Sequence, residues 1–128
     1  MPLHAFGDGM RKAVVTAGLA FEVARREADG GPKPGGLLLL DEAEVALHVS
    51  SQKDFFSALI GLCRKLEVQL FLTTHSLETV DAILQACEGK DEDLAAYRLA
   101  KKGPRTSITS YPGAFLRETR YEMGFEIR

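Results

Sequence analysis

Two short apolar runs, each followed by polar residues, constrain the fold of this chain more than any other feature. Residues 37–40 read LLLL, and residues 68–75 read VQLFLTTH. Neither run alternates strictly between apolar and polar positions, so each is expected to be a strand buried on both faces, as in a parallel sheet. A helical pattern lies between them, as a parallel connection requires. The sequence therefore predicts an α/β fold with a mainly parallel sheet and helices in layers on both sides.

The first helix is expected over residues 10–28, and the loop DGGPKPGG at 29–36 ends it because glycine and proline together break a helix. Apolar residues recur there at three- and four-residue steps and predict one inward stripe. That stripe consists of Met10, Val14, Ala17, Phe21, Ala24 and Ala28.

Two further helices follow the strands. One starts near Ser50 or Ser51, where Ser51 and Asp54 have the spacing of a capping box. The other is capped by Ser76 and stops at Gly89. The inward residues of the two helices are expected to be Phe55, Phe56, Leu59, Ile60, Leu62, Cys63 and Leu66, and then Leu77, Val80, Ile83, Leu84 and Cys87.

The last part of the chain reads as a β-hairpin and a short helix. Residues 95–113 favour a hairpin that turns at Gly103 and Pro104. A helix over residues 114–123 is expected to stop at Gly124, and we interpret its two arginines, Arg117 and Arg120, as a solvated face.

Composition excludes several classes of protein. The chain has 128 residues, 45% of them apolar and 27% charged, which is the size and composition of one globular domain. A net charge of -2 gives no basic field for nucleic acid, and no apolar run is long enough to span a bilayer, so no membrane partner is expected. Cys63 and Cys87 fall in helical patterns and read as reduced core residues, which indicates the cytoplasm.

The ends of the two strands carry the chemistry. Asp41 and Glu42 follow one strand, and Thr73, Thr74 and His75 end the other. In open parallel sheets ligands bind at the carboxyl ends of strands, so these groups should meet at one edge. Unpaired carboxylates beside apolar strands call for a cation, a water molecule or a phosphate as partner.

Each residue type there suits one part of a phosphoryl reaction. Asp41 fits a Mg²⁺ ligand that acts through a bound water, and Glu42 fits the base that orients an attacking water. His75 can donate a hydrogen bond to a terminal phosphate. A plainer interpretation treats DEAE as a charged helix start, His75 as an ordinary histidine and KKGPR at 101–105 as a solvated turn or a minor nucleic-acid contact.

These motifs resemble those of a known family. LLLLDE resembles the Walker B motif of ABC-type ATPases with its following glutamate, EVALHVSSQ the D-loop segment, and FLTTHS the strand that ends in the switch histidine. FGDGMRK at 6–12 resembles a variant of the ABC signature loop, and LRETRYEMGFEIR resembles the tail of standalone members. The pattern is most similar to the AAA-like ATPase domain of the OLD (overcoming lysogenization defect) family, which is related to SMC proteins. The resemblance covers almost the whole chain.

The resemblance implies specific roles. It aligns Asp41 with the magnesium aspartate, Glu42 with the catalytic glutamate and His75 with the switch histidine. It places His48 in the segment that contacts the partner subunit. It also assigns a loop that presents backbone N–H groups to a nucleotide held by another subunit, formed by Gly7, Gly9 and Arg11.

One departure from the family is large. No G-x-x-x-x-G-K-S/T pattern occurs in the sequence, and neither GGPKPGG nor EGKD supplies one, so the loop that cradles phosphates is missing. The signature-like loop also lacks the usual serine and carries Asp8. Residues 1–128 are therefore expected to be a single domain, the C-terminal half of an ABC/OLD-like ATPase domain with a partial P-loop NTPase fold.

Three functions are open at this stage. The first is ATP binding and Mg²⁺-dependent ATP hydrolysis, with a homodimer or a missing N-terminal half as partner. The second is an inactive remnant that serves as a binding or dimerisation module. The third is a metal-dependent nuclease using Asp41, Glu42 and Glu44; a nuclease or nucleic-acid partner rests on analogy with relatives alone.

The missing P-loop strand also predicts an open sheet edge. In ATPases of this kind that strand lies between the strand of residues 68–75 and the strand that begins at residue 95. Its loss would leave unpaired N–H and C=O groups, which recruit other strands. We therefore expect either that the hairpin closes directly onto residues 68–75 or that another chain pairs there.

Overall fold

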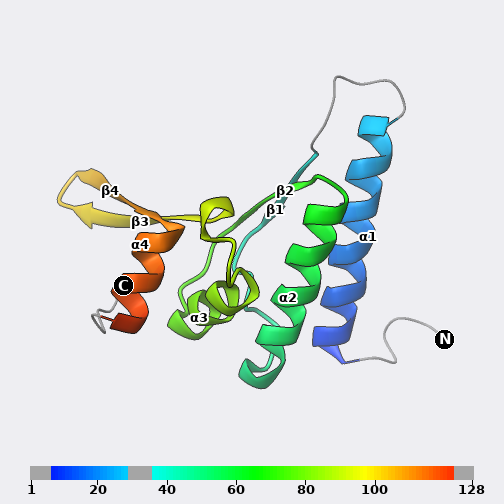
Figure 1. Cartoon of the computed structure of the whole chain (residues 1–128), viewed down its shortest axis with the longest axis horizontal. Helices are drawn as coiled ribbons and strands as arrows, with labels where there is room; N and C mark the ends of the chain where they lie inside the picture. Colours follow the sequence, from blue (N-terminus) through cyan, green and yellow to red (C-terminus); the bar gives the residue numbers. More distant parts are fainter. Residues whose placement is uncertain (1–6, 29–35, 123–128) are drawn as a thin grey trace.

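The computed structural model describes residues 7–28 and 36–122. The elements run in the order helix, strand, helix, strand, helix, followed by a hairpin and a short helix (Figure 1). Their bounds are α1 (Asp8–Ala28), β1 (Leu37–Leu40), α2 (Val49–Lys65), β2 (Gln69–Leu72), α3 (Leu77–Ala86), a 3₁₀ turn η2 (Asp91–Asp93), β3 (Ala95–Lys102), β4 (Arg105–Pro112), α4 (Gly113–Arg117) and a π-helical turn η3 (Glu118–Glu122).

Strands β1 and β2 pair in parallel, from Leu37 opposite Gln69 to Leu40 opposite Leu72. This pairing confirms the predicted α/β arrangement, with α2 as the connection. Strand β1 has the predicted bounds, whereas β2 is shorter than the run of residues 68–75 that was expected to form it. None of the described helices is long and apolar enough to cross a membrane.

Helices cover one face of the parallel pair and leave the other bare. Leu38 is buried against α1 and α2, and Leu40, Leu70 and Leu72 pack into the same core. On the opposite face Leu37 is 50% exposed, Leu39 67% and Phe71 50%. The expectation of strands buried on both sides, in a three-layer domain, is therefore wrong for the described residues, since no described element packs on the second face.

Two apolar clusters form the core on the covered face. One joins α1, α2 and the strands around Ala20, Leu38 and Leu59. The other joins α2 to α3 around Phe56 and Ile83, and Phe55 meets Phe56 edge to face with ring centroids 5.1 Å apart. Helix α2 contributes to both clusters, so it links the sheet to α3.

Helix α1 faces the core with a different side from the one expected. Met10, Val14 and Phe21, which belong to the predicted inward stripe, are about half exposed. Thr16 and Ala20 are buried instead. Ala24 of the predicted stripe does pack against the core, so the prediction is wrong for the large side chains of the stripe and holds for this small one.

Side chains cap the starts of α2 and α3. Ser76 accepts a hydrogen bond from the backbone N–H of Thr79 at 3.2 Å, which confirms the predicted cap of α3. At α2 the prediction of Ser51 as the cap is wrong: His48 accepts from the backbone N–H of Ser50, so the helix begins at Val49. Gly89 has a φ of 78°, in the left-handed region, and turns the chain after α3.

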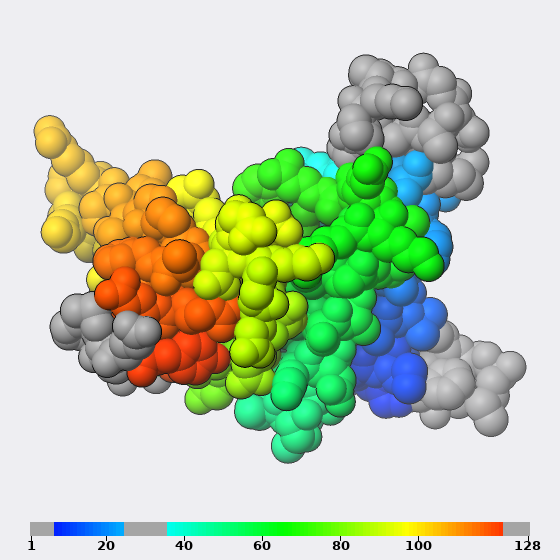
Figure 2. Space-filling model, viewed as in Figure 1, coloured from blue at the N-terminus to red at the C-terminus, as the bar shows by residue number. Residues whose placement is uncertain are grey.

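Strands β3 and β4 form their own antiparallel sheet, joined by the two residues Gly103 and Pro104. Gly103 has a φ of 61°, which the turns of two-residue hairpins require, so the predicted turn is confirmed. The hairpin pairs with neither β1 nor β2. The first of the two alternatives, closure of the hairpin onto β2, is therefore wrong, while pairing of the edge with another chain stays a prediction. The hairpin projects from the body of the molecule (Figure 2).

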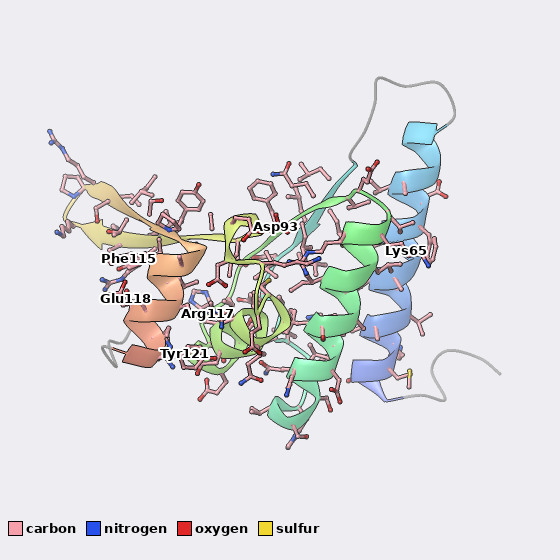
Figure 3. The ribbon with its side chains drawn as sticks, viewed as in Figure 1. Lys65, Asp93, Phe115, Arg117, Glu118 and Tyr121 are labelled. Atoms are coloured by element: carbon pink, nitrogen blue, oxygen red, sulfur yellow. The ribbon has the colours of Figure 1, made fainter. Side chains whose placement is uncertain are left out.

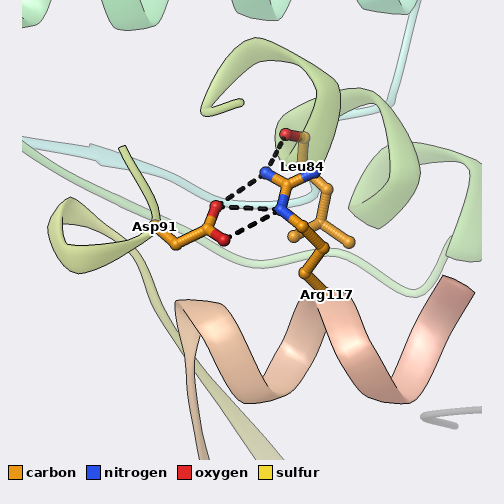
Figure 4. A network of polar contacts seen from close by, with 3 residues as sticks. All are labelled: Leu84, Asp91 and Arg117. Carbon is orange, nitrogen blue, oxygen red and sulfur yellow. Dashed lines mark hydrogen bonds and ion pairs between the residues drawn. The ribbon is translucent and has the colours of Figure 1, made fainter. Parts of the chain in front are cut away.

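Helix α4 is held against the turn before β3 and against α3. A Cβ on Gly113 would lie 2.1 Å from the carbonyl oxygen of Asp91, so only glycine fits there. Figure 3 shows Arg117 directed from α4 toward α3. Its guanidinium binds both carboxylate oxygens of Asp91 and donates to the carbonyl of Leu84 at 2.7 Å (Figure 4).

Arg120 makes a second ion pair from the C-terminal segment, this one to α3. Its Nη2 lies 2.8 Å from Oδ2 of Asp81, and its Nε donates to Oδ1 at 2.9 Å. The interpretation of Arg117 and Arg120 as a solvated face is therefore wrong: both attach the C-terminal helix. The expected stop at Gly124 lies outside the described residues.

Candidate functional site

The carboxyl ends of β1 and β2 meet at one edge of the sheet. The backbone N–H of Thr73 donates to the carbonyl of Leu40, and the N–H of Ala43 donates to the carbonyl of Thr73, both at 2.9 Å. These two bonds continue the pairing of the strands beyond their ends. As expected from the topology, the segment with Asp41 and Glu42 lies beside the one with His75.

Thr73 links the two acidic residues. Its hydroxyl donates to Oδ1 of Asp41 at 2.5 Å and accepts from the backbone N–H of Glu42 at 2.8 Å. One side chain therefore orients the Asp41 carboxylate and the Glu42 backbone together. The sequence predicted that Thr73 lies at this edge with His75, but it assigned Thr73 no role.

Glu42 has an unusual backbone and a free side chain. Its φ is 48°, in the left-handed region, which costs a non-glycine residue roughly 1–2 kcal/mol. The Thr73 hydroxyl and the N–H of Val45, which donates to the Glu42 carbonyl at 3.0 Å, hold this conformation. The exposed Glu42 carboxylate bonds to no described residue, so it is available to a ligand.

Glu44 links the two segments that follow β1 and β2. Its Oε1 accepts from the backbone N–H of His75 at 3.1 Å. Burial alone would raise the pKa of Glu44, but hydrogen bonds from Thr74, its own backbone and His75, together with the electrostatic effect of the His75 ring, leave that pKa lowered. Glu44 is thus an ionised residue that positions His75.

The three carboxylates do not form a metal cage. Within residues 7–28 and 36–122, no group of three or more His, Cys, Asp or Glu side chains could hold a metal ion. Asp41 already shares one oxygen with Thr73, and Glu44 is engaged with His75. The nuclease reading based on Asp41, Glu42 and Glu44 therefore gains no support.

The start of α1 lies against residues 42–47, the acidic loop that contains Glu42 and Glu44. A Cβ on Gly9 would be 3.1 Å from the carbonyl oxygen of Ala46. Nζ of Lys12 donates to the carbonyls of Ala43 and Val45 at 2.6 and 2.7 Å. Burial lowers the pKa of Lys12, and the Glu44 carboxylate opposes that effect only in part. Lys12 is a residue of the site that sequence reasoning missed.

The other predicted residues near α1 and α2 remain exposed. Gly7 is open to solvent, and Arg11 pairs with Asp8 at 3.4 Å, an exposed contact of little energetic weight. Nδ1 of His48 lies 2.7 Å from Oγ of Ser50, so the imidazole caps α2. Within the described part of the chain, no hydrogen bond or ion pair joins Gly7, Arg11 or His48 to the carboxylates of Asp41 and Glu42 or to the His75 ring.

Comparisons with known proteins place this geometry in a family. The family model described as "AAA ATPase domain" matches residues 1–80, a range that includes every predicted site residue from Gly7 to His75. An uncharacterized protein of Methanocaldococcus jannaschii is 31% identical over 124 residues, which cover 95% of this chain and 98% of that protein. No solved structure matches the chain. Since the family model covers more than half of its residues, the chain belongs to the AAA ATPase domain family.

Proposed function

We propose that this chain supplies the water-activating and phosphate-sensing part of an ATPase site that binds Mg·ATP. The observation that carries the proposal is the arrangement at the ends of β1 and β2, where Thr73 joins Asp41 and Glu42. Membership of the AAA ATPase domain family makes a nucleotide the expected ligand. The finer assignment, to the OLD group and its partial P-loop fold, rests on the motifs LLLLDE and FLTTHS.

Each residue has a role that its contacts allow. Asp41 suits Mg²⁺ because this ion prefers one or two carboxylates with phosphates and waters rather than a protein cage. When bound there, Mg²⁺ would offset phosphate charge. Glu42, with its carboxylate exposed and its backbone fixed, accepts a proton from the attacking water. His75, positioned through Glu44, donates to the terminal phosphate.

A second subunit completes the site in this proposal. Gly7, Gly9 and Arg11 lie at the N-terminal end of α1, where backbone N–H groups favour a phosphate. They would contact a nucleotide bound mainly by the partner copy. His48, exposed at the start of α2, would lie at the same interface. This arrangement implies a homodimer that holds nucleotides between its subunits.

A P-loop must come from another segment or chain. The N–H groups of Gln69 and Thr73 point toward the β1 side, so the backbone groups of Leu70 and Leu72 face the opposite, unpaired edge of β2. A strand carrying G-x-x-x-x-G-K-S/T would pair there. Its helix would cover Leu37, Leu39 and Phe71, as parallel sheets require.

A second candidate is a binding module without turnover. The absence of a P-loop motif from the sequence favours it. Titration calorimetry of the chain alone with Mg·ATP is expected to show no binding tighter than roughly millimolar under either candidate. Micromolar binding would mean that the chain holds a phosphate site of another kind.

Supplying the P-loop in trans separates the two candidates. The wild-type chain is mixed with a fragment of a family member that carries the P-loop strand and helix, and phosphate release is measured with Mg·ATP. Turnover that needs both components supports the ATPase. A stable complex that binds ATP but releases no phosphate identifies the binding module. The control is the same fragment with its P-loop lysine replaced by alanine.

A further inference from the structure

Lys12 makes an unusual set of contacts for a lysine on the first turns of a surface helix. Its Nζ lies 2.6 Å from the carbonyl oxygen of Ala43, 2.7 Å from that of Val45 and 3.4 Å from that of Glu42. Neither the Ala43 nor the Val45 carbonyl accepts a backbone N–H from the described residues. Lys12 therefore supplies the donor that two carbonyls of the acidic loop would otherwise lack.

The chemistry of an ammonium group fits this position. It has three donors and no acceptor, so it can bind several carbonyls that converge on one point. The carbonyls converge because Glu42 and Ala46 both have left-handed backbones, with φ of 48° and 69°, which coil residues 42–47 tightly. The bonds from Val45 N–H to Glu42 and from Leu47 N–H to Glu44 close this coil.

Gly9 adds a second contact on the same side of α1. It lies three residues before Lys12, so both project from one helix face. Because a Cβ on Gly9 would come within 3.1 Å of the Ala46 carbonyl, glycine lets α1 approach the loop closely enough for Lys12 to reach it. The first turns of α1 and the loop are therefore attached at two points.

We infer that Lys12 is a positioning residue that ties the acidic loop to the start of α1, so that the Gly7–Arg11 segment and Glu42 move as one body. The attachment of the loop to α1 follows from the contacts of Lys12 and Gly9 alone. Its consequence for turnover rests on the proposed function: a phosphate that binds at Gly7–Arg11 would then fix the backbone of the catalytic Glu42. In a dimer with two nucleotides, contacts of Gly7–Arg11 with one nucleotide would thereby shift Glu42, which activates water at the other nucleotide.

Amide hydrogen exchange of the wild-type chain tests the tie without any nucleotide. Lys12→Met keeps the length of the side chain but removes its donors, and the amides of Val45 and Leu47 are expected to exchange about tenfold faster. Lys12→Arg retains N–H donors and should restore most of the protection. Lys53→Met, on the exposed side of α2, is the matched control and should leave both amides unchanged.

Two outcomes would overturn the tie. One is unchanged exchange at Val45 and Leu47 in Lys12→Met. The other is an equal acceleration at Val80 and Cys87, whose amides are bonded within and at the end of α3, because that would show a global loss of stability rather than a local release.

Turnover of the P-loop-complemented protein tests the consequence. Lys12→Met should lower kcat about tenfold with KM for ATP unchanged, and Lys12→Arg should recover most of it. A rise in KM with kcat unchanged contradicts a role in positioning Glu42. If the complemented wild type shows no turnover, the proposed function fails, while the exchange experiment still decides the tie.

Discussion

The β1–β2 region and the β3–β4–α4 region of this protein differ in how far the described residues supply their strand pairing and packing. Among residues 7–28 and 36–122, the parallel pair has helices on one face, a bare face with Leu39, and no partner strand at the outer edge of β2. The hairpin is paired along its whole length, from Ala95 opposite Pro112 to Lys102 opposite Arg105, and α4 attaches it to α3. The family match covers the first region and ends at residue 80, before the second begins.

The difference follows from how each kind of sheet closes. An antiparallel hairpin needs a two-residue turn and local pairing, both of which its own sequence supplies. Parallel strands need crossovers and burial on both faces, which only distant segments can provide. In our proposal, the region that carries Asp41 and Glu42 is therefore the one that needs further protein to complete its sheet.

The sharpest test of this division is Glu42→Gln. In the P-loop-complemented protein it should lower turnover by about 10²–10⁴-fold, because the amide cannot accept a proton from water. The exposed Glu42 carboxylate makes no hydrogen bond or ion pair with the described residues, so the melting temperature should not change. Phosphate release and thermal unfolding are measured together. Glu92→Gln, in the turn before β3, is the control and should retain wild-type turnover; equal turnover in both variants would remove Glu42 from the mechanism.

A substitution in the second region should have the reverse effect. Gly113→Ala places a methyl group against the Asp91 carbonyl and should reduce the free energy of unfolding by about 2–3 kcal/mol. Denaturant unfolding measures this loss. Gly61→Ala in α2 meets no atom within 4 Å and should stabilise the chain slightly, since alanine favours a helix. Similar results for the two alanines would contradict the close packing of α4.

Acid titration compares one carboxylate from each region. The hydrogen bonds and charge of Arg117 hold the pKa of Asp91 below its ordinary value of 3.8, and that of Glu44 is also lowered, from 4.5. A carboxyl whose pKa is lower in the folded state stabilises the fold above its unfolded pKa and loses that effect as pH falls through the folded value. Stability should therefore decline below about pH 4.5.

The variants Glu44→Gln and Asp91→Asn separate the two contributions. Each variant should lose less stability than the wild type as pH falls, Glu44→Gln from pH 4.5 downward and Asp91→Asn from pH 3.8 downward. Unfolding monitored by circular dichroism from pH 6 to pH 3 shows which group titrates. An unchanged pH profile in Asp91→Asn would mean that the ion pair with Arg117 contributes no stability in solution.

The smallest effect is expected on the bare face of the sheet. Leu39→Ser should change the stability of the isolated chain by no more than about 0.5 kcal/mol, because the side chain is largely exposed. Its buried neighbour provides the control, since Leu38→Ala should cost about 2–5 kcal/mol. Leu39→Ser should nevertheless weaken binding of the P-loop fragment. Normal binding by that variant would show that the fragment does not cover this face.

Local patterns in the sequence determined much of this fold. The apolar runs indicated β1 and β2, Ser76 indicated the start of α3, and Gly103 with Pro104 indicated the hairpin turn. The rule that parallel strands share a carboxyl edge predicted that the segment with Asp41 lies beside the one with His75. These features were predictable because turn chemistry, capping and short apolar runs act over a few residues, and because connection rules leave few topologies.

Only the tertiary structure decided the remaining features. Lys12 reaches the acidic loop across about thirty positions of sequence, and α1 buries Ala20 instead of Met10. Arg117 pairs with Asp91 of η2 and Arg120 with Asp81 of α3, rather than with solvent. Each depends on where distant backbones come to lie. A long charged side chain has the same local pattern whether it ends in water or at a carboxylate, so its partner is set by the packing of the elements around it.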